Sequence, residues 1–138
     1  MRYFDSSALA KWYIEERGTD LVKRLLDAPA ATSRLSGVEV PSAIIRRARE
    51  AATPAARRDG VLHSFSLGFA DLLIVELAPQ VVIAANGIMS RNALRASDAI
   101  HLASCVSLSH DLGADIPFVA FDERLRAAAI AEGLRVEP

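Results

Sequence analysis

The chain has 138 residues, of which 51% are hydrophobic and 24% charged, a composition that indicates a folded globular protein and excludes a disordered one. Its formal net charge of −1 excludes a protein that binds nucleic acid through overall positive charge, although cations in an acidic site can still hold phosphate. The one cysteine excludes an intramolecular disulfide, which fits a reducing cytoplasm, and no apolar run approaches the roughly 20 residues of a membrane span.

Hydrophobic spacing in the first half of the chain predicts short strands followed by amphipathic helices. The expected elements are a strand at Arg2–Phe4, helices at Ser7–Glu16 and Thr19–Ala28, a strand at Ala30–Ser33, and helices at Ser36–Ala52 and Pro54–Phe65. We expect Trp12 and Tyr13 to pack in the core rather than against a dimer partner. We expect Pro41 to kink its helix because proline lacks the backbone N–H.

The second half of the chain repeats this alternation. It is expected to contain a strand at Leu72–Leu77, helices at Pro79–Ile88 and Ala96–Leu112, a strand at Pro117–Phe121, a helix at Asp122–Glu132 and a strand at Leu134–Val136. Short strands alternating with longer helices predict βαβ crossovers and a parallel sheet covered on both faces. We therefore expect an α/β fold that forms one domain over residues 1–138.

Four acidic residues are expected to meet at one edge of this sheet. Asp5 directly follows the first strand, and Asp122 directly follows the strand at Pro117–Phe121. Glu39 and Asp98 lie at the beginnings of helices, which start near the edge where parallel strands end. Carboxylates held together repel one another unless a cation joins them, and Mg²⁺ prefers oxygen ligands. The pattern thus indicates a metal site.

Helix capping is the alternative interpretation of the same acids. Asp5, Asp98 and Asp122 all lie where N-cap residues belong, and aspartate is among the best N-caps. Ser36 and Glu39 have the spacing of a capping box. Spacing alone leaves both interpretations open.

Four segments carry a resemblance to a known family. They are YFDSSALAKWY (Tyr3–Tyr13), SGVEVPSAI (Ser36–Ile44), LRASDAIHLA (Leu94–Ala103) and FVAFDERLRAAAIAEGLRV (Phe118–Val136). Together they resemble the PIN-domain nucleases, and most closely the VapC-type toxins of bacterial toxin–antitoxin pairs. The resemblance implies a three-layer α/β/α sandwich with a short parallel sheet, and Mg²⁺- or Mn²⁺-dependent cleavage of RNA in which one or two metal ions activate a water.

The resemblance also implies roles for particular residues. The family's catalytic acids fall on Asp5, Glu39, Asp98 and Asp122, with Asp5, Asp98 and Asp122 as metal ligands. Ser7, in the cofactor site, is expected to orient a carboxylate or a water rather than attack phosphate. The chain departs from the family at Ala120, where a threonine or serine is common. The implied partners are an RNA substrate, a cognate antitoxin and a second copy of the chain, with no membrane.

Two other classes of protein compete with this interpretation. A receiver-like signalling module needs a late lysine and a phosphoacceptor aspartate after a central strand, but the only lysines are Lys11 and Lys23. A PIN-fold scaffold without catalysis remains the alternative. His101 is expected to hydrogen-bond to a neighbour rather than ligate metal. The arginines between Arg46 and Arg58 indicate a solvated face, or else an RNA-backbone clamp or a docking surface for an acidic partner tail.

Overall fold

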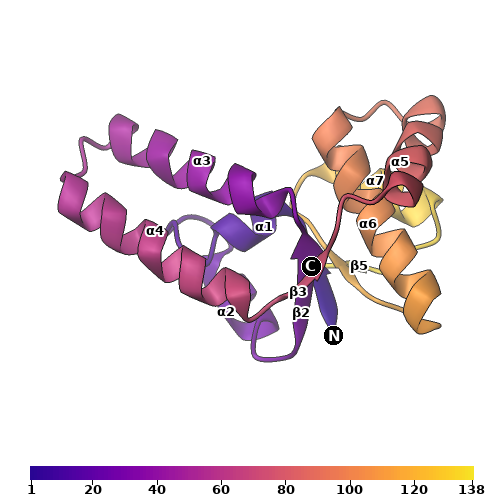
Figure 1. Ribbon diagram of the computed structural model, residues 1–138, viewed down its shortest axis with the longest axis horizontal. Coiled ribbons are helices and arrows are strands. Elements are labelled where there is room, and N and C mark those ends of the chain that lie inside the picture. Colours follow the sequence, from indigo (N-terminus) through magenta and orange to yellow (C-terminus); the bar gives the residue numbers. More distant parts are fainter.

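A parallel sheet of five strands, in the order β3-β2-β1-β4-β5, forms the centre of the molecule (Figure 1). The computed structural model describes all residues from Met1 to Pro138. The strands are β1 (Arg2–Phe4), β2 (Ala30–Ser33), β3 (Leu73–Val75), β4 (Phe118–Val119) and β5 (Val136–Glu137). The helices are α1 (Ser6–Ala10), α2 (Thr19–Leu25), α3 (Ser36–Glu50), α4 (Ala55–Ala70), α5 (Pro79–Arg91), α6 (Ala96–Leu112) and α7 (Glu123–Ala131).

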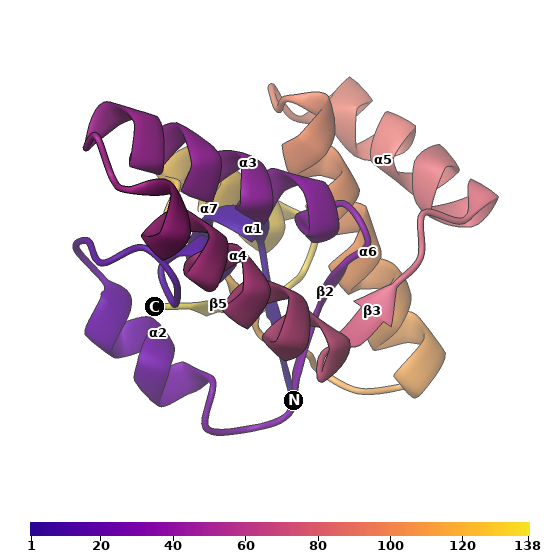
Figure 2. The same cartoon turned by 60° about the vertical axis from the view of Figure 1, so that its left-hand side comes forward.

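Helices cover both faces of the sheet. Successive strand residues point to opposite sides, so both faces carry apolar side chains that must be buried. Tyr3 and Phe118 pack into one buried cluster with residues of α5, α6 and α7. Phe4 and Val119 pack into the other, with residues of α1, α2, α3 and α4. Figures 1 and 2 show the two helical layers on either side of the strands. The predicted α/β/α sandwich is therefore confirmed. None of the helices combines the length and apolar character that a membrane span requires.

The strand order places a topological switch point between β1 and β4. From β1 the chain adds β2 and then β3 on one side, and β4 and β5 lie on the other. Tyr3 pairs with Phe118 and Phe4 with Val119, so the two central strands end level with each other. In open α/β sheets, ligands bind outside the carboxyl ends of the strands at such a point. The residues that follow Phe4 and Val119 therefore occupy the expected binding edge.

The helix expected at Ser7–Glu16 is wrong, because α1 ends at Ala10. The N–H groups of Lys11, Trp12 and Tyr13 bond to carbonyls three residues back, so the chain tightens into a turn. Tyr13 then packs edge-to-face against Phe65, with ring centroids 5.4 Å apart, whereas Trp12 is 41% exposed. The expectation of core packing therefore fails for Trp12.

Other bounds shift because neighbouring elements set them. The predicted strand Leu72–Leu77 shortens to β3, since β2 offers partners only from Ala31 to Ser33. The helix expected to end at Phe65 continues to Ala70, and the rings of Phe65 and Phe69 pack with their centroids 5.3 Å apart. The α3 helix runs through Pro41 to Glu50 without interruption.

Cys105 is expected to resist alkylation in the native protein. The thiol is buried in α6 against the carbonyl oxygen of Ile116, and burial raises its pKa from 9.0 to about 12. Only the thiolate reacts. At pH 8, iodoacetamide should modify Cys105 only as the protein unfolds in urea, and mass spectrometry measures this directly. Rapid modification of the native protein would contradict the burial.

The same shift predicts how stability depends on alkaline pH. Between pH 9 and about 12 the unfolded chain loses the Cys105 proton while the folded chain retains it. The contribution of this group to the free energy of unfolding therefore falls by about 1.4 kcal/mol per pH unit in that window. Urea titrations at several pH values measure the slope.

Candidate active site

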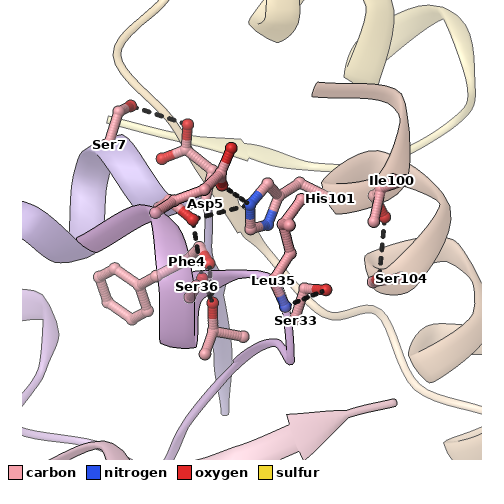
Figure 3. A network of polar contacts seen from close by, with 12 residues as sticks. Phe4, Asp5, Ser7, Ser33, Leu35, Ser36, Ile100, His101 and Ser104 are labelled. Atoms are coloured by element: carbon pink, nitrogen blue, oxygen red, sulfur yellow. Dashed lines mark hydrogen bonds and ion pairs between the residues drawn. The ribbon is translucent and has the colours of Figure 1, made fainter. Parts of the chain in front are cut away.

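Asp5 lies directly after β1 at the switch point, in a nearly buried position. Its backbone N–H donates to the carbonyl oxygen of Val119 at 3.2 Å, which ties it to the end of β4. Its Oδ1 accepts the N–H of Ala8 at 2.7 Å, and its Oδ2 accepts the Ser7 hydroxyl at 2.8 Å (Figure 3). Asp5 is thus the N-cap of α1, as the capping interpretation predicted, and its carboxylate is fixed in one orientation. The Ser7 hydroxyl holds one oxygen of this carboxylate, and its role in a cofactor site stays a prediction.

Burial makes the charge on Asp5 unfavourable. It raises the pKa of the carboxyl group, and the negative charge of Asp98 raises it further. The N–H of Ala8, the nearby His101 and the Ser7 hydroxyl act in the opposite direction but do not cancel the effect of burial. A buried acid with a second acid nearby is the arrangement that a bound cation would relieve.

Asp98 does not cap its helix. It is the third residue of α6, whose N-cap is Arg95, and the structure shows no hydrogen bond to its carboxylate. The capping interpretation is therefore wrong for Asp98. Asp98 is half-buried and close enough to Asp5 for its charge to act there. Because its carboxylate has no hydrogen-bond partner, it is free to act as a ligand.

Glu39 lies in the first turn of α3 and contacts His101. Its Oε2 is 2.9 Å from His101 Nε2, and 31% of its side chain is exposed. Burial raises the pKa of Glu39, but hydrogen bonding, first of all with His101, outweighs it and leaves the pKa below its ordinary value. Glu39 is thus ionised at neutral pH, and its Oε2 is held by His101.

His101 is buried and joins the strands to the acids. Its Nδ1 is 3.0 Å from the Tyr3 hydroxyl, and its Nε2 is 2.8 Å from Ser6 Oγ as well as close to Glu39. The expectation of a histidine hydrogen-bonded to a neighbour is confirmed. The sequence did not reveal these partners, which lie 62 to 98 positions away.

Ser36 is the clearest residue whose role the sequence interpretation missed. Its spacing to Glu39 suggested a capping box, but the N-cap of α3 is Leu35, which makes no side-chain cap bond. The Ser36 hydroxyl instead contacts Ser6 Oγ at 2.9 Å and Thr32 Oγ1 at 2.6 Å. The only sequence signal was a polar side chain at the beginning of a helix, shortly after a strand.

Asp122 is exposed and caps a helix, three residues after the end of β4. Its Oδ1 accepts the backbone N–H groups of Arg124 and Leu125 at 2.9 and 3.0 Å, so it is the N-cap of α7. Its role as a metal ligand stays a prediction, while its capping role is confirmed.

Substitutions at Asp122 can separate these two roles. Asp122→Ala should lower the free energy of unfolding by about 1 kcal/mol, because the cap is lost. Asp122→Asn should keep the stability, because asparagine caps as well as aspartate does. Urea denaturation of both variants checks this. If Asp122→Asn lost as much stability as Asp122→Ala, the charge rather than the cap would be the stabilising feature.

The arrangement fits a cation that retains much of its water. No group of three or more histidine, cysteine, aspartate or glutamate side chains forms a ready ligand set. Mg²⁺, however, is commonly bound by one or two carboxylates together with waters. Asp5 and Asp98, whose charges act on each other, are the two carboxylates that could hold such an ion.

The comparisons with known proteins agree with this architecture. A family model described as "PIN domain" matches residues 2–131. "Ribonuclease VapC45" of Mycobacterium tuberculosis strain CDC 1551 / Oshkosh is 33% identical over 138 residues, covering 99% of this chain and 94% of the relative. "Ribonuclease VapC46" of Mycobacterium tuberculosis strain H37Rv is 35% identical over 136 residues, covering 97% of this chain and 94% of the relative.

Solved structures extend the likeness at the level of fold. A toxin–antitoxin complex from Klebsiella pneumoniae matches with a TM-score of 0.67 at 15% identity, covering 100% of this chain and 97% of that chain. VapC20 of Mycobacterium tuberculosis, described as a sarcin–ricin loop cleaving toxin, matches with a TM-score of 0.67 at 16% identity, covering 93% and 95%. At such identities the match concerns the fold alone.

Proposed function

We propose, from the premise that the chain belongs to the PIN domain family, that it is a metal-dependent endoribonuclease acting as the toxin of a toxin–antitoxin pair in the cytoplasm. Two observations support this proposal. Relatives at 33% and 35% identity are named ribonucleases, and a toxin–antitoxin complex and a toxin of known structure share the fold with TM-scores of 0.67. The observation that carries the proposal is the buried Asp5 carboxylate, fixed at the switch point with the partnerless Asp98 nearby.

The roles of the residues follow from their contacts. Asp5 and Asp98 would hold Mg²⁺ or Mn²⁺, with Asp122 as a further ligand. When bound, the cation supplies a polarised water and neutralises charge on the phosphate. Ser7 keeps the Asp5 carboxylate oriented through its 2.8 Å hydrogen bond. Glu39, ionised and partly exposed, is available to accept a proton from the attacking water.

Cleavage of RNA by the purified chain tests this proposal. After treatment with EDTA, the protein should leave RNA intact, and addition of Mn²⁺ or Mg²⁺ should restore cleavage at defined positions. Sequencing the new RNA ends would identify the cleaved motif. Cleavage that persists in excess EDTA would contradict metal dependence. No cleavage of total cellular RNA with either metal would contradict the nuclease and favour the non-catalytic scaffold.

We also propose an antitoxin partner, which the fold match to a toxin–antitoxin complex suggests. A pocket of about 370 Å³ between α3 and α4 offers a candidate surface, with apolar side chains beside Arg47, Arg57 and Arg58. Its charge suits the acidic partner tail considered from the sequence. Co-expression of the product of a small neighbouring reading frame should relieve growth arrest, and Arg57→Glu with Arg58→Glu should abolish that relief. Relief that survives the double substitution would exclude this surface.

A homodimer is the remaining proposal taken from the family. Light scattering coupled to size-exclusion chromatography should give twice the 14.8 kDa mass of the chain. A mass of 14.8 kDa at every protein concentration measured would exclude the homodimer.

A further inference from the structure

A row of buried hydroxyl groups leads from the backbone of β1 to His101. Thr32 Oγ1 is 2.8 Å from the carbonyl oxygen of Phe4 and 2.6 Å from Ser36 Oγ. Ser36 Oγ is 2.9 Å from Ser6 Oγ, which is 2.8 Å from His101 Nε2. All four side chains are at most 8% exposed. Figure 3 shows Ser36 and His101 within this network beside Asp5.

Counting protons gives every bond in this row a direction. A carbonyl oxygen only accepts, so Thr32 donates its single hydroxyl proton to Phe4. Thr32 must then accept from Ser36, and Ser36, having donated, must accept from Ser6. Ser6 has no proton left for His101, so His101 Nε2 must donate to Ser6. One arrangement of hydrogens satisfies all four contacts.

This direction determines which ring nitrogen of His101 is protonated. The Nε2 proton is shared between Ser6 Oγ at 2.8 Å and Glu39 Oε2 at 2.9 Å. In the neutral ring, Nδ1 then accepts from the Tyr3 hydroxyl at 3.0 Å. The opposite tautomer would direct a nitrogen lone pair at the Glu39 carboxylate. The backbone carbonyl of Phe4 thus acts, through three hydroxyls, on the group that faces Glu39.

We infer that Thr32 and Ser36 are positioning residues. With Ser6 they hold His101 as the Nε2-protonated tautomer, which donates to Glu39 and keeps its carboxylate turned toward the site. The structural part of this inference stands on the hydrogen-bond geometry, and its catalytic part rests on the proposed function. None of the three hydroxyls is required to touch RNA or metal.

Nitrogen NMR of the ¹⁵N-labelled full chain tests the structural part, because the two ring nitrogens give different signals in each tautomer. The chain has three histidines, and the exposed His110 provides an internal reference. Wild type should show protonated Nε2. Glu39→Gln should show the same tautomer, because a glutamine amide can face either nitrogen and the hydroxyl row alone then decides. Adding Thr32→Val should make the Nδ1-protonated tautomer appear, and Thr32→Ser should not.

Three outcomes would overturn this part of the inference. They are protonated Nδ1 in the neutral ring of wild type, a changed tautomer in Glu39→Gln alone, and an unchanged tautomer in the double variant Thr32→Val with Glu39→Gln. If Thr32→Val does not fold, Ser36→Ala interrupts the row one step later and serves in its place. These measurements need neither metal nor RNA, so they are independent of the nuclease assignment.

Kinetics test the catalytic part. Thr32→Val should lower kcat on the order of tenfold and leave KM unchanged. Glu39 alone still favours the Nε2-protonated tautomer in this variant, but Ser36 can then donate to Ser6, and Ser6 can turn its proton toward Glu39, so the orientation of the Glu39 carboxylate is no longer fixed. Thr32→Ser should restore kcat. Thr19→Val is the matched control, because it also removes a buried threonine hydroxyl, one that contacts Ile14 and Glu16 instead. A kcat equal to wild type in Thr32→Val, or an equal loss in Thr19→Val, would overturn the positioning role. An inactive wild type with the expected tautomer would instead refute the proposed nuclease alone.

Discussion

Asp5→Asn is expected to abolish RNA cleavage and growth inhibition while the fold remains intact. The asparagine amide has the shape of the carboxylate, and its oxygen can still accept the N–H of Ala8. Its nitrogen can donate to the Ser7 hydroxyl, which rotates to accept. What disappears is the negative charge, so a cation loses a ligand at the switch point. The expected rate of RNA cleavage is that of a control reaction without protein.

The stability of Asp5→Asn provides the control for this loss. Burial raises the pKa of Asp5, so its ionised form is unfavourable in the metal-free fold. As the pH rises above the ordinary value of 3.8, the unfolded chain loses this proton first, and the contribution of Asp5 to stability falls through its raised folded pKa. Metal-free Asp5→Asn lacks this loss and should be at least as stable as wild type at pH 7. Urea denaturation with EDTA measures the difference, and a marked loss of stability would show that Asp5 is mainly structural.

Asp98→Asn is expected to have an equally large effect on activity. Asp98 neither caps α6 nor receives a hydrogen bond, so its removal should change the free energy of unfolding by less than about 0.5 kcal/mol. Because its charge raises the pKa of Asp5, its neutralisation should also make Asp5 easier to ionise. Cleavage assays and urea denaturation of the same preparation separate function from folding.

The exposed Asp111 provides a matched control for Asp98. It also lies on α6, and 73% of its side chain is exposed beside His110. Asp111→Asn should cleave RNA at the wild-type rate. Full activity in Asp98→Asn, or equal loss in the two variants, would refute the assigned role of Asp98.

The fold could be predicted from the sequence wherever local periodicity and sheet packing act together. Alternating strands and helices were sufficient for the parallel sheet and its two helical layers. Prediction failed at Trp12, because spacing of apolar residues does not reveal that the chain turns after Ala10. The ends of β3 could not be predicted either, since they depend on how far β2 extends.

The candidate site could be predicted only in part, for a similar reason. A position directly after a strand was enough to place Asp5 at the switch point, and the helix-start position brought Asp98 near it. The same reasoning treated Asp122 as equivalent, although its carboxylate caps α7 in solvent. The contacts of His101 with Ser6 and Glu39 arise from three separate segments, and no local pattern in the sequence encodes them.

Calorimetric titration of the EDTA-stripped chain with Mn²⁺ tests the central claim most directly. Wild type should bind Mn²⁺ with a saturable heat, and Asp5→Asn, folded and equally stable, should give none. Absence of binding to wild type, or equal binding to Asp5→Asn, would contradict a metal site built on the buried carboxylate at the switch point.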